Sequence, residues 1–299
     1  MRVFVTGATG FVGGFLGRHL RACGDEVVDP FVDLADTDSL WAAIAAARPD
    51  ALYHVAGQAD VSRSWKEPAE TYQINAIGTA NVIEGAVRAG SDPTVLVVSS
   101  GEVYGRVESA DLPVNEDHPL RPTTPYGASK AAAELIALQA HWGRALPVIV
   151  ARPFNHIGPG QSDAFVVSAM ARQIAEAERD ADPELCVGNL APARDFSDVR
   201  DVVRAYRACV MSGTPGRIYN VCSGVAVPIH DVVDRLIAMA HGTLRVVVDP
   251  SRVRPTDIAE IRGDASRVRA DTGWIPVHGL DEGLADVLDW WRERISRSA

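Results

Sequence analysis

A tyrosine and a lysine four residues apart have a spacing that suits chemistry. Tyr126 and Lys130 lie in PYGASKAAAELIALQ, which is rich in helix-forming residues, and a spacing of four puts both side chains on one helix face. An ammonium group beside a phenol favours the phenolate and lowers the phenol pKa from about 10 toward neutrality. The pair is suited to exchange a proton with a carbonyl or hydroxyl oxygen, although this spacing alone usually marks a solvated helix face.

A serine ends the apolar segment TVLVVSS at residues 94–100. Such a segment is typical of a buried parallel strand, and open parallel sheets bind ligands at the carboxyl ends of their strands. Ser100 is therefore placed to hydrogen-bond the same oxygen as Tyr126.

Three glycines, Gly7, Gly10 and Gly13, follow an apolar segment at 2–6 and precede a helical pattern that runs to Gly24. The early glycines allow a tight turn and close approach of the backbone to a pyrophosphate, and the last lets the helix pack near the sheet. The helix N-terminus stabilises the negative charge. Because the motif lies between a strand and a helix, it predicts a dinucleotide site.

The choice between NAD(H) and NADP(H) stays open. An acidic residue at the end of the second strand would bind the adenosine ribose and favour NAD, whereas a nearby arginine would favour NADP. Asp29 is the candidate, but Pro30 follows it. We expect Asp33 and Leu34, at the end of a strand predicted at 32–34, to lie beside the adenine.

Apolar segments alternate with helical patterns through the first half of the chain, which is typical of a parallel sheet covered on both faces. We therefore predict an α/β fold, a Rossmann doubly wound parallel sheet with a smaller C-terminal substrate-binding α/β domain. The predicted strands lie at 2–6, 32–34, 51–57, 94–100 and 146–152, and the helices at 37–47, 69–90 and 126–142.

The pattern changes after about residue 155, where loops with Gly and Pro separate shorter elements. Strands are predicted at 219–224 and 244–249, and a helix at 281–297 whose tryptophans suit core positions. We expect a dinucleotide-binding domain of residues 1–155 and 199–222. The substrate domain would comprise residues 156–198 and 223–299.

The bulk composition excludes several classes of function. A net charge of −10 over 299 residues argues against a nucleic-acid partner, because phosphate backbones need a basic face. The cysteines show no paired spacing, so we expect reduced thiols and no metal site. No segment has the length of an apolar membrane span, and Met1 leads directly into the first strand. We expect a cytoplasmic protein without a membrane partner.

Several motifs together resemble the extended short-chain dehydrogenase/reductases, a family of sugar-nucleotide epimerases, dehydratases and reductases. They are TGATGFVG, SSGEVYG, YGASK, RPFNHIGPGQ, VGNLAPARDFSDVRDVVRAY, YNVCSG and RPTDI. The resemblance runs over nearly the whole chain and is greatest to the GDP-4-keto-6-deoxy-mannose reductases, which form GDP-rhamnose. It implies an oxidoreductase that uses NAD(H) or NADP(H) to reduce the C4 ketone of a GDP-linked deoxyhexose.

The resemblance also assigns roles to the residues that match the family motifs. It implies catalysis by Ser100, Tyr126 and Lys130, with Glu102 as an acidic group near the sugar. Tyr126 would donate the proton, and Lys130 would also hold the nicotinamide ribose. Cofactor contacts would further include Gly7, Thr9, Gly10, Phe11, Val12, Gly13, Ala56, Gly57 and Pro153. Substrate contacts would be Asn155, Val187, Asn189, Arg194, Arg254 and Asp257.

Structural roles compete with some of these assignments. A diphosphate in a net-acidic protein needs localised guanidinium groups, yet Arg194 also suits a salt bridge with Asp195 or Asp198. Arg254 equally suits a solvated loop position.

Three further polar residues are assigned structural roles. His54 and His156 receive no catalytic role, and Asn75 suits an internal hydrogen-bonding role better than a substrate contact.

Two departures from the family pattern bear on function. HVAG at 54–57 replaces the commoner HLAA beside the cofactor, which tightens the backbone. Gly101 stands where dehydratases carry a polar or acidic residue, which disfavours dehydration because that reaction needs another acid/base pair. A 4-epimerase, a 4,6-dehydratase and a dinucleotide-sensing binding module stay as alternatives.

Apolar helix faces around 69–90 and 126–142 suit a four-helix homodimer interface.

Overall fold

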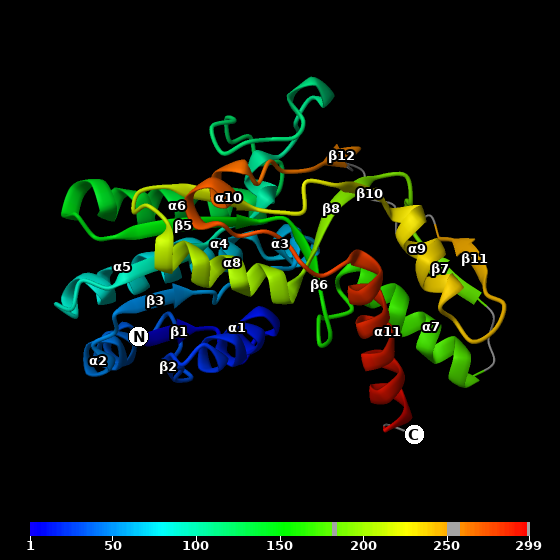
Figure 1. The fold of residues 1–299 in the computed structure, drawn as a ribbon, viewed down its shortest axis with the longest axis horizontal. Helices are drawn as coiled ribbons and strands as arrows, with labels where there is room; N and C mark the ends of the chain where they lie inside the picture. The colour runs from blue at the N-terminus through cyan, green and yellow to red at the C-terminus, as the bar shows by residue number, and fades with distance from the viewer. Residues whose placement is uncertain (181–183, 250–257, 298–299) are drawn as a thin grey trace.

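The central sheet has six parallel strands in the order β2-β1-β3-β4-β5-β9 (Figure 1). The computed structural model describes residues 1–180, 184–249 and 258–297. From β1 the chain goes outward to β2 and then crosses back to β3, so strand order reverses between β1 and β3. This is the predicted doubly wound sheet, which binds ligands at such a switch point. The strands are β1 Arg2–Thr6, β2 Glu26–Val28, β3 Ala51–His54, β4 Thr94–Val98, β5 Val148–Pro153 and β9 Ile218–Val221.

Helices cover both faces of the sheet, and each face buries an apolar cluster. On one face α1 Phe11–Ala22, α8 Val199–Ser212 and α10 Ser266–Thr272 pack together. On the other face lie α2 Thr37–Ala47, α5 Gly78–Arg88 and α6 Pro125–Arg144. Every residue of β3 and β5 is buried, as continuous apolar strands between two helix layers require.

The second strand differs from the prediction. It is β2, which pairs with β1 from Arg2 opposite Glu26 to Phe4 opposite Val28, whereas residues 32–34 belong to no strand. Pro30 has no N–H to continue the ladder. The Asp33 carboxylate then accepts a hydrogen bond from the Ala35 amide at 2.9 Å, which stabilises a turn.

The helix predicted at 69–90 is a series of three helical segments. They are α4 Pro68–Tyr72, the π-helical η1 Gln73–Ile77 and α5, and a further short helix, α3 Val61–Lys66, precedes them. Two 3-10 turns, η2 Gly101–Tyr104 and η3 Ser109–Asp111, follow β4. The other predicted elements are present, with ends that differ by no more than three residues.

A smaller group of elements follows β5 and has its own apolar cluster. Its helices are α7 Val166–Asp180, α9 Ile229–Ala238 and α11 Leu280–Ser296, which lie to one side of the sheet in Figure 1. Its strands are β6 Asn155–Ile157, β7 Glu184–Val187, β8 Ala193–Asp198, β10 Ala226–Pro228, β11 Arg245–Val248 and β12 Glu260–Ile261. The separate apolar clusters support the proposed division into two domains. Helix α10, whose residues were predicted in the substrate domain, packs instead on α8 and β9 of the dinucleotide-binding domain.

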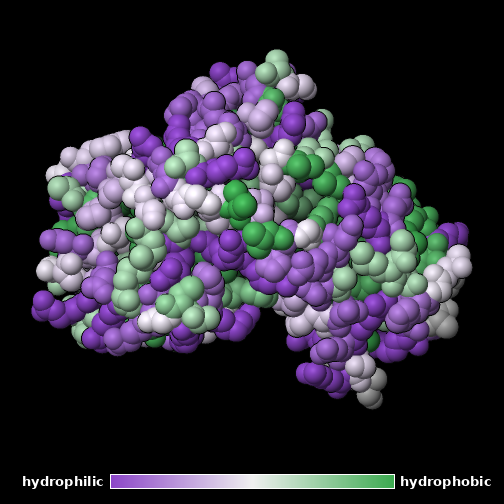
Figure 2. Space-filling view, viewed as in Figure 1, coloured by the Kyte–Doolittle hydropathy of each residue, from purple (hydrophilic) through white to green (hydrophobic). Residues whose placement is uncertain are grey.

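Apolar and hydrophilic residues are interspersed over the face shown in Figure 2. Within the described ranges, no helix combines the length and apolar character that crossing a membrane requires. The same ranges contain no group of three or more His, Cys, Asp or Glu residues able to hold a metal ion. The four cysteines are free thiols.

Candidate active site

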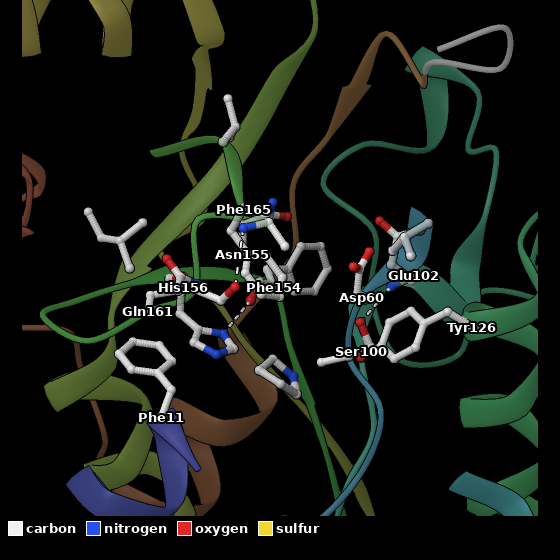
Figure 3. A pocket seen from close by; sticks show the side chains of 18 of the residues that line it. Phe11, Asp60, Ser100, Glu102, Tyr126, Phe154, Asn155, His156, Gln161 and Phe165 are labelled. Carbon is white, nitrogen blue, oxygen red and sulfur yellow. Dashed lines mark hydrogen bonds between the residues drawn. The ribbon is translucent and has the colours of Figure 1, made fainter. Parts of the chain in front are cut away.

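A cavity of about 780 Å³ opens at the carboxyl edge of the sheet, where the strand order reverses. It is lined by the turn after β1, the loop after β3, the end of β4, the start of α6 and the loops around β6 and β8. Figure 3 shows Ser100 and Tyr126 on one side of the cavity and Phe11 and His156 on the other. Its size and position suit a ligand site.

The glycine-rich turn is as tight as its spacing predicts. Gly7 has a φ of +74°, and a Cβ there would lie 2.7 Å from the Cα of Ala56. A Cβ at Gly13 would lie 2.0 Å from the carbonyl oxygen of Gly7. The Gly10 amide donates to that same oxygen at 3.0 Å. Side chains at positions 7 and 13 are therefore excluded by backbone atoms.

The first turn of α1 faces the cavity without a side-chain cap. Its N-cap residue is Gly10, which offers no side chain to the amides that follow. These N–H groups and the positive end of the helix dipole suit a phosphate group. The predicted cofactor residues that line the cavity are Gly7, Thr9, Gly10, Phe11, Val12, Gly13, Ala56, Gly57, Tyr126, Lys130 and Pro153.

The two residues predicted beside the adenine lie outside this cavity. Asp33 forms the turn described above, and Leu34 packs on α5, where a Cβ at Gly78 would lie 2.9 Å from its Cδ1. Asp29, at the end of β2, forms a 2.6 Å salt bridge with Arg21 of α1.

Tyr126 lies in the first turn of α6, which Thr124 caps by accepting from the Gly127 amide at 3.0 Å. Burial raises the pKa of Tyr126 to about 12, and the nearby Ser100 hydroxyl opposes this only in part. The expectation that Lys130 brings this pKa toward neutrality is therefore wrong for this structure, because desolvation dominates. A phenol that stays protonated at neutral pH suits a proton donor.

Lys130 lies one turn further along α6 and is buried. Its Nζ donates a 2.7 Å hydrogen bond to the carbonyl oxygen of Val98, at the end of β4. Burial lowers the pKa of Lys130 to about 8, with Glu134 acting in the opposite direction. A Cβ at Gly57 would lie 3.5 Å from this Nζ and 2.9 Å from Oδ1 of Asn75. The glycine in HVAG therefore leaves room for these two buried side chains.

Asn75 fixes the loop after β3 to the catalytic helix. Its Oδ1 accepts from the Gln58 amide at 2.8 Å. Its Nδ2 donates to the Gln58 carbonyl oxygen at 3.0 Å and to Oγ of Ser129 at 2.9 Å. The internal role predicted for Asn75 is confirmed, and it orients the helix that carries Tyr126 and Lys130.

His54 belongs to a buried chain of hydrogen bonds behind the cavity. The Thr79 hydroxyl donates to the Asn75 carbonyl oxygen at 2.6 Å, so Thr79 Oγ1 accepts from His54 Nε2 at 3.0 Å. His54 Nδ1 then accepts from the Thr6 hydroxyl at 2.8 Å. Burial lowers the pKa of His54 to about 3, which keeps the ring neutral. Its role is structural, as predicted.

A buried ion pair stabilises α6 against β5 below the catalytic residues. Arg152 donates to both carboxylate oxygens of Glu134, at 2.8 and 2.7 Å, and to Tyr104 Oη at 2.9 Å. The Ser99 hydroxyl also hydrogen-bonds Glu134, and Tyr104 donates to Asn220 of β9 at 2.6 Å. This network joins β4, α6, β5 and β9 just behind Ser100.

Four of the substrate residues predicted from the resemblance line the cavity, together with the acidic residue predicted near the sugar. Asn155, Val187, Asn189 and Arg194 all line it, as Glu102 does. Arg194 donates to the carbonyl oxygens of Ala193 and Ile258, at 2.9 and 2.7 Å. Two further predicted substrate residues, Arg254 and Asp257, lie outside the described residues.

The proposed salt-bridge partners of Arg194 are engaged elsewhere. Asp198 pairs with Arg200 at 2.7 Å, and Asp195 accepts from the Ser223, Gly224 and Gly263 amides at 2.8, 2.9 and 3.2 Å.

A family model described as GDP-mannose 4,6 dehydratase matches residues 30–287. The chain belongs to this family. The GDP-6-deoxy-D-mannose reductase of Pseudomonas aeruginosa is 40% identical over 98% of this chain and 98% of its own length. The structure of RMD from Pseudomonas aeruginosa complexed with NADPH has a TM-score of 0.92 at 40% identity, covering 98% of this chain and 99% of that chain.

A more distant relative of known structure is MoeE5, solved in complex with UDP-glucose and NAD. It is 28% identical with a TM-score of 0.85, over 99% of this chain and 100% of that chain. A second MoeE5 structure, also 28% identical with a TM-score of 0.85, holds UDP-glucuronic acid and NAD and covers 98% of this chain and 100% of that chain. The predicted family and fold are thus confirmed.

Several residues that line the cavity were not predicted from the sequence of this family member. They include Gln58, Asp60 and Gln161, with His156, whose ring lies parallel to Phe11 at a centroid distance of 6.1 Å. Gln58 and Asp60 lie in the loop that follows β3, and polar residues at that edge were an available signal. Gln161 ends the quoted motif RPFNHIGPGQ but was given no role, and the fold of the loop after β6 brings it into the wall.

Proposed function

We propose that this chain is an NAD(P)-dependent oxidoreductase that reduces the C4 ketone of GDP-4-keto-6-deoxy-mannose and forms GDP-rhamnose. The observation that carries the proposal is that Ser100, Tyr126 and Lys130 line the same cavity as the glycine-rich turn, with burial raising the pKa of the Tyr126 phenol. The 40% identity to a GDP-6-deoxy-D-mannose reductase over nearly the full length supports the substrate.

The residues around the glycine-rich turn fit a nicotinamide dinucleotide. When bound, NAD(H) or NADP(H) supplies the hydride that C4 receives. The uncapped amides of α1 would hold the pyrophosphate, because no side chain competes for them. Lys130 would hold the nicotinamide ribose. Asp33 and Leu34 lie outside the cavity and stay predictions for the adenine end of the cofactor.

Proton delivery is the task of three side chains. Tyr126 donates its phenolic proton to the oxygen on C4 as the ketone becomes an alcohol, and Ser100 hydrogen-bonds that oxygen. The phenolate left on Tyr126 is stabilised by the positive charge of Lys130. Glu102 accepts hydrogen bonds from sugar hydroxyls.

We place the GDP end of the substrate on the wall of the cavity opposite Tyr126 and Ser100. Arg194, Asn155, Asn189 and Val187 line this wall, and a guanidinium group suits a diphosphate. Arg254 and Asp257 stay predictions for the same end of the ligand.

Gly101 favours a reductase over a dehydratase. A Cβ at this position would lie 3.3 Å from three atoms of the Phe154 ring, so a side chain there would require the ring to shift by a few tenths of an ångström. Without an acid/base group at this position the elimination of water lacks a partner. A sensing module is disfavoured because Tyr126 and Lys130 are both present. A 4-epimerase would retain its cofactor through turnover.

The assembly proposed here is a cytoplasmic homodimer built on the helical segments 69–90 and 126–142. Leu135 and Trp142 lie seven residues apart on α6 and are 60% and 69% exposed, and Tyr72 and Ile77 are exposed near the start of the other segment. Burying such side chains against a second copy would remove apolar surface from water.

A coupled assay with GDP-4-keto-6-deoxy-mannose tests the function. We expect NADH or NADPH oxidation matched by GDP-rhamnose formation, and a fall of about 10²–10⁴-fold in kcat for Tyr126→Phe with unchanged cofactor affinity. Turnover of a GDP-hexose with no net oxidation of cofactor would instead indicate an epimerase. Near-normal reduction by Tyr126→Phe would exclude it as the proton donor.

A further inference from the structure

A buried carboxylate lies one helical turn beyond Lys130, and the proton transfer proposed for Tyr126 does not involve it directly. Glu134 follows Lys130 by four residues on α6, which puts both side chains on the same helix face. The Glu134 side chain is 2% exposed. A charge in such a place is unfavourable unless its surroundings compensate it, so the groups around it indicate what it does.

The Glu134 carboxylate is held from two strands of the sheet. Arg152 of β5 donates to Oε1 at 2.8 Å and to Oε2 at 2.7 Å, which is the bidentate geometry of a strong guanidinium–carboxylate pair. The Ser99 hydroxyl, at the end of β4, also bonds Oε1. These bonds give the carboxylate one fixed orientation.

Lys130 is attached to the end of the same strand, β4. Its Nζ donates to the Val98 carbonyl oxygen at 2.7 Å, whereas Glu134 takes the hydroxyl of the next residue, Ser99. Ser100, which follows, lines the cavity. The two charged groups of α6 thus hold the strand end that carries the proposed catalytic serine.

The ammonium group of Lys130 has a neutral hydrogen-bond partner, so its compensating charge comes from elsewhere. Burial lowers the pKa of Lys130 because it disfavours the charged form, and Glu134 acts in the opposite direction. One carboxylate thus serves two cations, Arg152 by direct contact and Lys130 at longer range.

Other titratable groups around Lys130 stay neutral over the range in which it titrates. Burial raises the pKa of Tyr126, on the same helix, to about 12, and lowers that of His54 of β3 to about 3. Burial also raises the pKa of Tyr206 of α8. Glu102 of η2 acts on the Tyr126 phenol, whereas the carboxylate on α6 acts on Lys130.

We propose that Glu134 is a positioning residue, whose fixed carboxylate holds Lys130 as an ammonium group beside Tyr126. This inference rests on the proposed function, in which the positive charge stabilises the phenolate left after proton transfer. Glu134 is not among the described residues that line the cavity, so it acts through Lys130.

The sequence allows a direct test, because Lys130 and Lys66 are the two lysines of the chain. Lysine labelled isotopically at Cε gives one NMR signal for each, and Lys66, which is exposed on α3, is an internal reference. We expect the Lys130 signal of the wild-type chain to have its titration midpoint at about pH 8. In Glu134→Gln the midpoint should lie about one pH unit lower, because a nearby negative charge is lost. An unchanged midpoint would overturn the inference.

The direction of this change separates the proposed role from a merely structural one. A variant that only loosened the fold would admit water to Lys130 and raise its midpoint toward the ordinary value for lysine, about 10.4. A rise in Glu134→Gln would therefore contradict the proposal. The double replacement Glu134→Leu with Arg152→Leu removes the pair without leaving an unpaired buried charge. Its Lys130 midpoint should also be lower than that of the wild type, and a rise there would contradict the proposal too.

Glu134→Asp separates charge from shape. Glutamine keeps the size of the side chain without its charge, whereas aspartate keeps the charge on a shorter side chain. We expect the Lys130 midpoint of Glu134→Asp to lie nearer to that of the wild type than the midpoint of Glu134→Gln does. The reverse order would assign Glu134 a role in packing alone.

The matched control is Glu84→Gln, which breaks an exposed pair with Arg144 at the other end of α6. It should leave the Lys130 midpoint unchanged, and an equal fall there would remove the argument from the buried carboxylate. A lower midpoint in Glu134→Gln, in a chain whose wild type does not reduce the ketone, would contradict only the proposed function. Ketone reduction by the wild type with an unchanged midpoint in Glu134→Gln would contradict only this inference.

Discussion

Burial shifts the pKa values of Tyr126 and Lys130 in opposite directions. It raises the pKa of the phenol to about 12 and lowers that of the ammonium group to about 8, because in both cases it disfavours the charged form. At neutral pH both side chains therefore carry their protons. For Tyr126 this is the starting state that ketone reduction needs, whereas alcohol oxidation would need its phenolate.

A pH profile of kcat/KM follows from these shifts. We expect it to fall as the pH rises through about 8, because Lys130 is charged below its pKa and neutral above it, whereas Tyr126 stays protonated over this range. The profile of kcat/KM reports ionisations of the free enzyme. In Lys130→Arg the cation persists, so the alkaline decrease should disappear while some activity remains. A decrease at the same pH in this variant would assign the titration to another group.

The turn between β1 and α1 shows how an element restricts side chains. We expect Gly13→Ala to weaken dinucleotide binding by roughly tenfold or more, because the added Cβ would lie 2.0 Å from the Gly7 carbonyl oxygen and must displace the turn. Equilibrium fluorescence titration with NADH and NADPH measures this.

Gly14→Ala is the matched control on the same helix. Its Cβ would meet ordinary contacts at 3.6 and 3.8 Å, so binding should be unchanged and stability slightly greater, since alanine is the better helix former. Equal losses in the two variants would show that the helix as a whole, and not the turn, is sensitive.

The buried pair between α6 and β5 is predicted to stabilise the fold. Glu134→Gln leaves the Arg152 guanidinium without its counter-ion, and both side chains are 2% exposed, so the free energy of unfolding should fall by about 3 kcal/mol. Urea denaturation measures this. The double replacement Glu134→Leu with Arg152→Leu should lower the free energy of unfolding by less than the sum of the two single replacements. Glu67→Gln, at the exposed pair with Arg63, should leave stability unchanged; a similar loss there would contradict the argument from burial.

At the scale of the whole molecule, the proposed homodimer predicts the molar mass of the protein in solution. We expect light scattering at micromolar concentration to report a dimer, and Leu135→Arg combined with Trp142→Arg to produce a monomer, because two charges would enter an apolar interface. Val277→Arg, at a side chain that is 61% exposed elsewhere on the surface, should stay dimeric. A monomeric wild-type chain would exclude the proposed assembly.

Local patterns were enough to predict much of the fold and the centre of the site. The glycines at 7, 10 and 13 and the Tyr126–Lys130 spacing act over one turn of chain, so their geometry can be derived from neighbouring residues alone. The alternation of apolar strands with helices predicted the sheet. The second strand was misplaced because three residues at a sheet edge carry little pattern.

The tertiary structure decided what depends on groups distant in the sequence. Burial by the surrounding elements reversed the expected pKa shift of Tyr126, and the pairing of Arg152 with Glu134 joined residues 18 positions apart. The folded chain also brought Asp60 beside Glu102 in the wall of the cavity. The sequence by itself thus determined the glycine-rich turn and the Tyr126–Lys130 spacing, since these are local, whereas the desolvation of Tyr126 and Lys130 arises only when separate elements pack together.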